Sequence, residues 1–297
     1  MNGIYLKMER PPHFNFSEIL AFLNRSSEEV LHRVEGRTLF KRIKVEDERI
    51  LIKVTCEEGQ ILLEFPAGAS ENGQKAASVY IREWLDLDRD LTGFFWTAAR
   101  DPVIEDLAVR FKGLRLIGIP DLFEALSWAV IGQQINLSYA YKIKKRFVER
   151  YGERADYGGE TYWLFPDCRQ IAVLSTEELT QFSFTKRKAE YIIGIAGLMA
   201  GSKLTKESLR QAGGFKEKKA LLMNIRGVGD WTAEYVLMKC LREPSALPAG
   251  DAGFQNALIE QLGLSHKPST DEINSAAARW RGWEAYAVFY LWRSLYD

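Results

Sequence analysis

The sequence has little cysteine or histidine, and neither residue type is clustered. There are three of each in 297 residues, far apart and without any CxxC pair. Scattered cysteines favour reduced thiols over a disulfide framework. Scattered histidines and cysteines predict no metal site. The six residues are Cys56, Cys168, Cys240, His13, His32 and His266.

Long apolar runs are also missing. The N-terminal stretch MNGIYLKMERPPHFNF has no apolar segment of signal-peptide length, and no segment approaches the roughly 20 apolar residues of a membrane span. We therefore expect no membrane partner and a cytoplasmic, nucleoid-associated protein.

Charge of one sign is not in excess. Forty basic residues balance forty acidic ones, whereas many nucleic-acid binders are strongly basic. Composition alone thus argues mildly against a nucleic-acid partner. With 46% hydrophobic residues and nine prolines, the chain is typical of a folded protein with more than one compact unit.

The first part of the chain predicts a small α/β domain over residues 1–100. Three short, partly alternating runs separated by turn-like residues predict an antiparallel three-stranded meander. Helical patterns flank it, as two short helices in 16–34 and as a helical stretch over 75–98 with a break near residues 88–90. The three strand-like runs are residues 38–45, 49–56 and 60–67.

The remainder, 101–297, has helical periodicity with Gly or Pro between the segments, as in residues 122–152, 186–201 and 283–296. We predict that this part is all-α. The expected fold class is therefore α+β, with a small antiparallel sheet followed by a mostly helical region.

The most informative segment joins two predicted helices through a glycine-rich turn. An apolar helix ends at Ile225, Gly227-Val228-Gly229 follows, and a second helix begins at about Trp231. Such a turn exposes backbone N–H groups at a helix start, where the helix dipole favours an anion such as a DNA phosphate. Main-chain contacts of this kind need little net positive charge. By itself, however, a GxG between helices is equally a simple turn.

The residues around the turn carry a family resemblance. Ile225-Arg226-Gly227-Val228-Gly229-Asp230-Trp231-Thr232-Ala233-Glu234-Tyr235 is followed by Leu247-Pro248-Ala249-Gly250-Asp251. This composite resembles the helix-hairpin-helix (HhH-GPD) DNA glycosylase superfamily, in particular its bacterial 3-methyladenine DNA glycosylase II branch. The resemblance extends over nearly all of 110–297 and, more loosely, over the N-terminal part. It implies the same fold and a glycosylase activity.

Asp251 is the catalytic carboxylate that the resemblance implies. The residues alone favour a helix N-cap, since Asp251 follows Pro248-Ala249-Gly250 and precedes a helical pattern. The two roles are compatible, because a carboxylate at a helix N-terminus is stabilised as an anion. Such a group can stabilise the oxocarbenium-like state of N-glycosidic cleavage.

Three aromatic residues are pocket candidates by family position. Trp231 and Tyr235 are four residues apart and share a helix face, and Trp292 lies near the C-terminus. Electron-rich rings bind a cationic alkylated base by cation–π attraction. Trp231 also stands where bifunctional relatives carry a Schiff-base lysine, so the resemblance implies a monofunctional enzyme. The alternative is that these rings are core.

Gln134 lies at the wedge position of the family, where the 3-methyladenine type carries Leu, so the substrate range stays open; a surface glutamine is the alternative. Two basic clusters could line DNA or could simply be solvated. They are Lys142, Lys144, Lys145 and Arg146, and Lys186, Arg187 and Lys188.

Together these features predict a monomeric glycosylase that flips alkylated purines from damaged double-stranded DNA. The DNA contacts are assigned to Gly227, Val228, Gly229 and Gln134. No cofactor is expected beyond a monovalent cation that the resemblance allows at the hairpin. Two alternatives remain, a glycosylase for another damaged or mismatched base and a non-enzymatic DNA-lesion binder.

Overall fold

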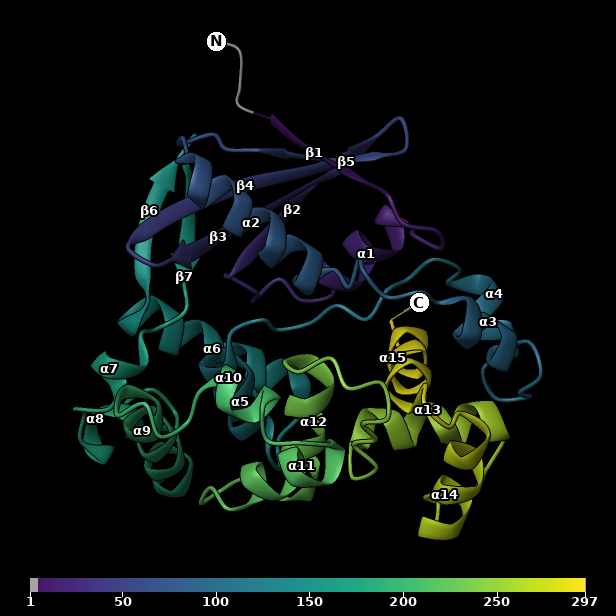
Figure 1. Ribbon diagram of the computed structural model, residues 1–297. Coiled ribbons are helices and arrows are strands. Elements are labelled where there is room, and N and C mark those ends of the chain that lie inside the picture. Colours follow the sequence, from purple (N-terminus) through teal and green to yellow (C-terminus); the bar gives the residue numbers. More distant parts are fainter. Residues whose placement is uncertain (1–4, 297) are drawn as a thin grey trace. The chain divides into compact units, whose positions relative to one another are not determined.

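The computed structural model describes residues 5–296, which form two compact units, each built from several chain segments (Figure 1). The first comprises the described residues up to Arg10, together with Leu23–Trp84 and Asp121–Thr205. The second comprises Pro11–Phe22, Leu85–Pro120 and the described residues from Lys206 onward. Each unit therefore contains residues from both sides of residue 100. The boundary between an N-terminal α/β domain and a helical region at this residue stays a prediction.

The first unit contains a five-stranded antiparallel sheet in the order β1-β5-β4-β3-β2. The predicted meander is confirmed as β3 (Thr38–Val45), β4 (Glu48–Glu57) and β5 (Gln60–Glu64). Two edge strands extend it, β1 (Tyr5–Glu9) beside β5 and β2 (His32–Glu35) beside β3.

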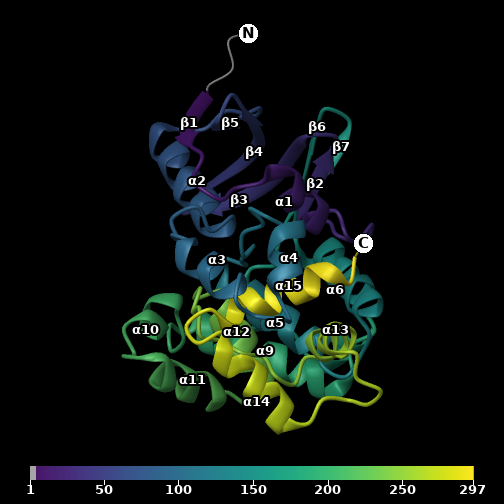
Figure 2. The same cartoon turned by 90° about the vertical axis from the view of Figure 1, so that its right-hand side faces the viewer.

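One face of this sheet is covered by helix α2 (Glu71–Trp84), which crosses it in Figures 1 and 2. Alternate residues of β4, such as Ile52 and Val54, are completely buried, and so are Ala77 and Ile81 of the helix. Gly73 allows the close approach, since a Cβ there would lie within 3 Å of the Glu48 and Ile50 side chains. Burial of this apolar face, proportional to the area removed from water, stabilises the layer.

The prediction of two helices in 16–34 is wrong in its second half. Only α1 (Phe16–Leu23) forms, and His32–Glu35 is strand β2. The Glu29 carboxylate accepts hydrogen bonds from the backbone N–H groups of Val30 and Leu31, at 2.9 and 2.8 Å. The side chain thus competes with helical hydrogen bonding, and the chain leaves the helical path to pair with β3.

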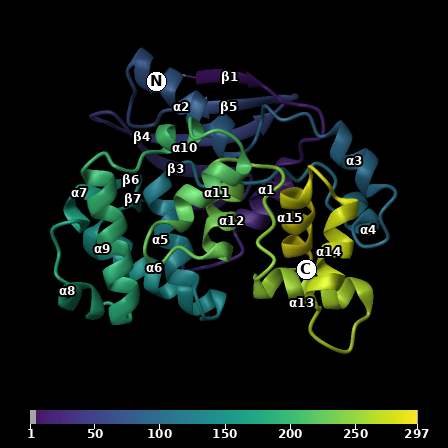
Figure 3. The ribbon, with the colours of Figure 1, turned by 60° about the horizontal axis from the view of Figure 1, so that its bottom comes forward.

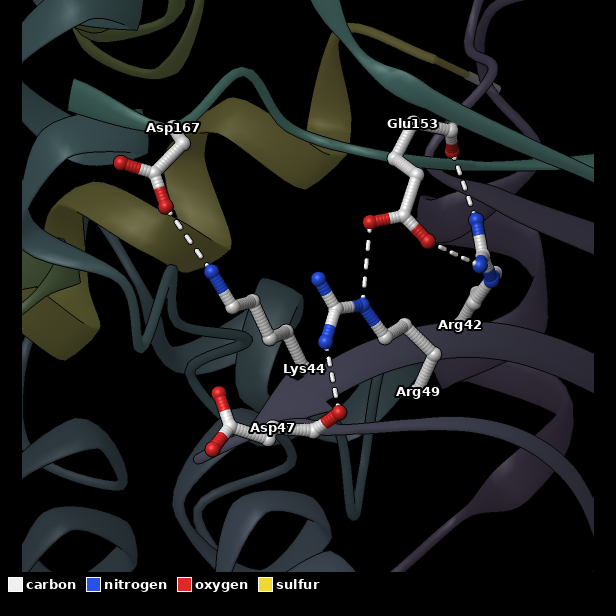
Figure 4. Close-up of polar contacts among 6 residues, drawn as sticks. All are labelled: Arg42, Lys44, Asp47, Arg49, Glu153 and Asp167. Carbon is white, nitrogen blue, oxygen red and sulfur yellow. Dashed lines mark hydrogen bonds and ion pairs between the residues drawn. The ribbon is translucent and has the colours of Figure 1, made fainter. Parts of the chain in front are cut away.

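The region predicted as all-α also contains a β-hairpin, β6 (Glu153–Tyr157) and β7 (Glu160–Leu164). Gly158 and Gly159 both have positive φ, as a two-residue hairpin turn requires. Figure 4 shows how charged side chains join this hairpin and the following segment to the sheet: Arg42 and Arg49 both contact Glu153, and Lys44 contacts Asp167. The Gly-Gly pair between β-prone residues was the sequence signal for this hairpin.

Helices complete both units where periodicity predicted them. The first unit contains α5 (Leu122–Gly132), α6 (Leu137–Tyr151), α7 (Cys168–Ile171), α8 (Thr176–Thr180) and α9 (Lys186–Ala200). Besides α1, the second contains α3 (Thr92–Ala98), α4 (Glu105–Arg110), α10 (Lys206–Arg210), α11 (Phe215–Met223), α12 (Asp230–Lys239), α13 (Ala252–Leu262), α14 (Thr270–Arg279) and α15 (Glu284–Ser294). The predicted break near residues 88–90 is confirmed, because α2 ends at Trp84 and α3 begins at Thr92.

The core of the second unit surrounds α15, which Figure 3 shows beside α13 and α14. Tyr286, Phe289 and Tyr290 of α15 are buried, and Trp280 and Phe254 pack with their rings at a centroid distance of 6.4 Å. Tyr290 donates a hydrogen bond to the Leu114 carbonyl, so the buried hydroxyl is satisfied. Within residues 5–296, no helix is both long enough and apolar enough to cross a bilayer.

Candidate active site

Asp251 caps helix α13 and also accepts hydrogen bonds from two indoles. Its Oδ1 accepts from the Phe254 backbone N–H at 2.8 Å and from Trp292 Nε1 at 2.8 Å, and its Oδ2 accepts from Trp231 Nε1 at 3.3 Å. The predicted N-cap is therefore confirmed. Neutral N–H donors orient the carboxylate without supplying a compensating positive charge, so its negative charge is not neutralised by these contacts.

The three candidate pocket aromatics lie together around this carboxylate. The ring centroids of Trp231 and Tyr235 are 5.7 Å apart, and those of Tyr235 and Trp292 are 6.0 Å apart. Tyr235 is 8% exposed, whereas the two tryptophans are only partly buried. The arrangement brings aromatic surface to the same place as an anionic oxygen, which suits a flat, positively charged ligand.

Two other C-terminal tryptophans pack in or against the core rather than beside Asp251. Trp280 is fully buried, and Trp283 packs against Phe94 and Tyr286.

The hairpin connects α11 to α12 through Asn224–Gly229. Gly227 has φ +91°, a left-handed backbone that side chains rarely adopt, and Val228 is buried beneath the turn at 5% exposure. Gly229 is the N-cap of α12. Because glycine has no side chain, the N-cap accepts no side-chain hydrogen bond from the first backbone N–H groups of this helix. A Cβ at Gly229 would meet no atom within 4 Å, so the surface there is open.

A lysine of α11 is fixed beside the hairpin by two carboxylates. Lys219 Nζ lies 2.7 Å from Asp230 Oδ1 and 2.6 Å from Glu234 Oε1. Burial lowers the pKa of Lys219, but the hydrogen bonds that its amine donates to both carboxylates outweigh this and hold the pKa above its ordinary value. The amine is therefore protonated and is a poor nucleophile.

Glu234, which was not predicted as a site residue, is 5% exposed. Its Oε2 accepts a hydrogen bond of 2.8 Å from the Leu247 backbone N–H. Burial raises its pKa, although Lys219 and this N–H oppose the shift. Its signal in the sequence is weak, because α12 buries the polar residues Thr232 and Lys239 as well.

Gln134 belongs to the first unit, in the connection between α5 and α6. It is exposed and has φ +57°, an uncommon backbone for a non-glycine residue and therefore locally strained. The adjoining end of α5 is held by Lys188, whose Nζ donates to the Ile131 carbonyl at 2.8 Å. The role of Gln134 as the wedge in base flipping stays a prediction.

Each of the two basic clusters contains a buried lysine. Lys144 is buried between Glu29 and Glu124, at 2.9 and 3.5 Å, and Lys145 pairs with Glu28. Lys188 is also buried. Lys142, Arg146, Lys186 and Arg187 remain exposed. Among the residues that the structure describes, no group of three His, Cys, Asp or Glu side chains could hold a metal ion.

The fold and the hairpin together define a helix-hairpin-helix protein. Residues 127–282 match the family model of the HhH-GPD superfamily base excision DNA repair proteins, and residues 24–126 match that of the 8-oxoguanine DNA glycosylase N-terminal domain. The chain therefore belongs to the HhH-GPD superfamily of base excision DNA repair proteins. The resemblance seen in the sequence is confirmed.

Individual relatives agree with this assignment. The chain is 42% identical over 290 residues to a DNA-3-methyladenine glycosylase of Bacillus subtilis strain 168, covering 96% of this chain and 95% of the relative. It is 28% identical over 180 residues to DNA-3-methyladenine glycosylase 2 of Escherichia coli strain K12, covering 61% and 60% of the two chains.

Solved structures show the same fold over nearly the whole chain. The 3-methyladenine DNA glycosylase from Archaeoglobus fulgidus is 25% identical, with a TM-score of 0.85 and 98% of both chains covered. The Clostridium acetobutylicum 8-oxoguanine glycosylase/lyase in complex with DNA is 16% identical, with a TM-score of 0.74 over 99% of this chain and 98% of that one. At this identity the second comparison establishes the fold alone.

Proposed function

We propose that this protein is a monofunctional DNA glycosylase that flips alkylated purines of the 3-methyladenine and 7-methylguanine type from duplex DNA. It hydrolyses the N-glycosidic bond and leaves an abasic site for base excision repair. One observation carries the proposal: the Asp251 carboxylate, held by the Trp231 and Trp292 indole N–H groups, lies within a cluster of three aromatic rings. Relatives named as 3-methyladenine glycosylases support the substrate class.

The chemistry needs one carboxylate. An N3- or N7-alkylated purine carries a positive charge, so it leaves with the electron pair of the C1′–N bond and becomes neutral without an added proton. The charge that develops on the sugar is stabilised by the Asp251 anion. Water then adds to C1′ and loses a proton to this carboxylate or to solvent. Asp251 is therefore the proposed catalytic residue.

The substrate-binding roles follow from the rings. Trp231, Tyr235 and Trp292 offer π surfaces to the flipped, cationic base. Strand cleavage by a Schiff base is not part of the proposal, since an indole occupies position 231 and Lys219 is protonated in two ion pairs.

The DNA contacts are assigned to the hairpin and to Gln134. Backbone N–H groups at Gly227, Val228 and Gly229 bind a phosphate, helped by the dipole of α12. Gln134 fills the gap that base flipping leaves. We further propose that damaged duplex DNA is bound by a monomer, in the cytoplasm with the nucleoid, and without a cofactor beyond a monovalent cation at the hairpin.

Base release from methylated duplex DNA tests the function. Wild type is expected to release 3-methyladenine or 7-methylguanine and to leave strands that break only in alkali. Asp251→Asn should lower the release rate by about 100-fold or more, as the loss of one electrostatic group does in other enzymes. The variant should stay folded and bind DNA, because Asn is also a good N-cap.

Two outcomes would replace the proposal. If wild type releases no base and Asp251→Asn keeps the full DNA-binding function of wild type, the protein is a lesion-binding protein. Release of an oxidised or mismatched base in place of alkylated purines indicates the second candidate, which the match of residues 24–126 to an 8-oxoguanine glycosylase domain favours. A panel of duplexes with one defined lesion each separates these results.

A further inference from the structure

Glu234 makes two hydrogen bonds in different directions from a buried position on α12. Oε1 accepts from Lys219 Nζ of α11 at 2.6 Å, and Oε2 accepts from the Leu247 backbone N–H at 2.8 Å. The side chain is 7% exposed. One carboxylate therefore connects the second helix of the hairpin both to the first helix and to the segment that leads to Asp251.

The segment from Leu247 to Asp251 is short and internally bonded. Ala249 N–H donates to the Leu247 carbonyl at 2.7 Å, and Asp251 N–H donates to the Pro248 carbonyl at 2.9 Å. Gln255 Nε2 donates to the Ala249 carbonyl at 2.8 Å. Consecutive hydrogen-bonded turns thus link Leu247 to the Asp251 backbone.

The contacts of Lys219 extend this connection to the hairpin turn. Besides Glu234, its amine contacts Asp230, the first residue of α12 and the neighbour of Gly229. A continuous series of polar contacts therefore runs from the turn that would bind a phosphate to the loop that carries the carboxylate.

We infer that Glu234 is a positioning residue for the glycosylase reaction, which fixes the Asp251 loop to the phosphate-binding hairpin through its bond to Leu247. The inference rests on the proposed function. It assigns Glu234 no contact with the substrate. Glu234 instead affects the position of the Asp251 carboxylate when DNA is bound. A misplacement of a catalytic group by about 1 Å can lower the rate on the order of 100-fold.

The need to balance the charge of Lys219 does not explain why Glu234 makes hydrogen bonds with both of its oxygens. Lys219 keeps Asp230 as a partner when Glu234 is removed. One oxygen of Glu234 would suffice for an ion pair. The second oxygen accepts a hydrogen bond from the backbone N–H of Leu247, 13 residues later in the chain. That bond fixes a loop, and it satisfies a partly buried N–H donor that would lose free energy if it were left without a partner.

Three variants separate the roles. Glu234→Ala removes both bonds. Glu234→Gln retains one amide oxygen, which should face Leu247 because Lys219 still has Asp230. Glu260→Ala is the matched control, since this glutamate lies exposed on α13. Each is compared in single-turnover release of 7-methylguanine, in affinity for a duplex with a tetrahydrofuran abasic-site analogue, and in thermal midpoint.

For Glu234→Ala we expect release slowed by about tenfold or more, with affinity for the duplex changed by less than about threefold. Glu234→Gln should recover most of the rate, and Glu260→Ala should match wild type. A wild-type rate in a folded Glu234→Ala protein overturns the inference. So does a loss of rate that Glu234→Gln does not relieve, or one in which rate and affinity fall together.

Amide hydrogen exchange without DNA gives a readout that does not need activity. The Leu247 amide should exchange faster in Glu234→Ala than in wild type and close to wild type in Glu234→Gln. If wild type releases no alkylated base, the proposed function fails, and exchange alone still decides whether Glu234 holds the loop. Unchanged exchange at Leu247 rejects the coupling.

Discussion

The Trp292 indole donates a hydrogen bond of 2.8 Å to Oδ1 of Asp251, a residue 41 positions earlier in the chain. The same oxygen accepts the capping bond from the Phe254 N–H. Helix α15 and the start of α13 are thereby fixed to each other at the carboxylate. Besides the aromatic surface that we propose for the base, Trp292 therefore supplies a donor to Asp251, and the two roles are separable.

Trp292→Phe removes the N–H and keeps a ring. Because Asp251 retains its capping bond but loses a directed donor, we expect base release to slow by about tenfold with little change in DNA affinity. Single-turnover kinetics and a binding titration measure the two effects. Trp96→Phe, at an indole 62% exposed on α3, is the control. A rate equal to wild type would mean that the indole N–H has no orienting role.

The two hairpin glycines should respond differently to alanine. Gly227→Ala places a Cβ at φ +91° and is expected to destabilise the protein by about 1–2 kcal/mol. Gly229→Ala has φ −90° and open space around the added methyl, so the free energy of unfolding should stay within about 0.5 kcal/mol.

Affinity for DNA completes this comparison. Gly229→Ala should weaken binding to duplex DNA several-fold, because the methyl group stands where a phosphate approaches the N–H groups of α12. Denaturant unfolding and salt titrations of binding check both variants. Unchanged affinity of Gly229→Ala would argue against a phosphate at this turn.

Borohydride should trap no covalent protein–DNA adduct. Lys219 is a lysine beside the hairpin, and its amine is protonated by virtue of the ion pairs with Asp230 and Glu234. Wild type and Lys219→Met are incubated with lesion-containing duplex and borohydride, then separated under denaturing conditions. A strong adduct in wild type that disappears in Lys219→Met would establish lyase chemistry and contradict the monofunctional assignment.

His32 should make the stability of the protein fall as the pH falls below 6.5. Burial lowers its pKa from 6.5 to about 4, more than the nearby Glu29 carboxylate raises it, while Lys41 and Lys144 lower it further. The unfolded chain therefore binds the proton first on acidification, and the free energy of unfolding decreases between pH 6.5 and about 4.

His32→Gln should flatten this part of the profile, since the amide still donates to the Leu23 carbonyl that His32 Nε2 contacts at 3.0 Å. Urea unfolding midpoints between pH 4 and pH 7 measure the effect. His266→Gln, at an exposed histidine, serves as the control. A His32→Gln profile as steep as that of wild type would assign the acid sensitivity to other groups.

Local pattern predicted the elements whose signals lie within a few residues. The meander, the helices of the second half and the N-cap at Asp251 all followed from periodicity or capping chemistry, and each is present. The hairpin turn was predicted to within two residues at both helix ends, since α11 ends at Met223 and α12 begins at Asp230. The four-residue spacing of Trp231 and Tyr235 placed their rings together.

Long-range contacts decided what local pattern left open. Strand β2 pairs with β3, although its residues were predicted as helix, because the sheet supplies hydrogen bonds that an isolated segment lacks. The charge runs left open whether the lysines line DNA or are solvated, and Lys144 and Lys188 are in fact buried. Burial depends on what faces a residue, which its own sequence neighbours do not reveal.

The sequence by itself determined the class of fold, the turn between two helices and the N-cap at Asp251, because each depends on residues close together in the chain, and the family resemblance singled out Asp251 as the candidate carboxylate. Only the tertiary structure brought Trp292 to Asp251 and Glu234 to the Leu247 amide. Those bonds join helices separated by loops, and their geometry depends on how the apolar faces of the helices pack. The position of the Asp251 carboxylate therefore depends on how the folded core packs. Its identification as a candidate depended only on the sequence around it.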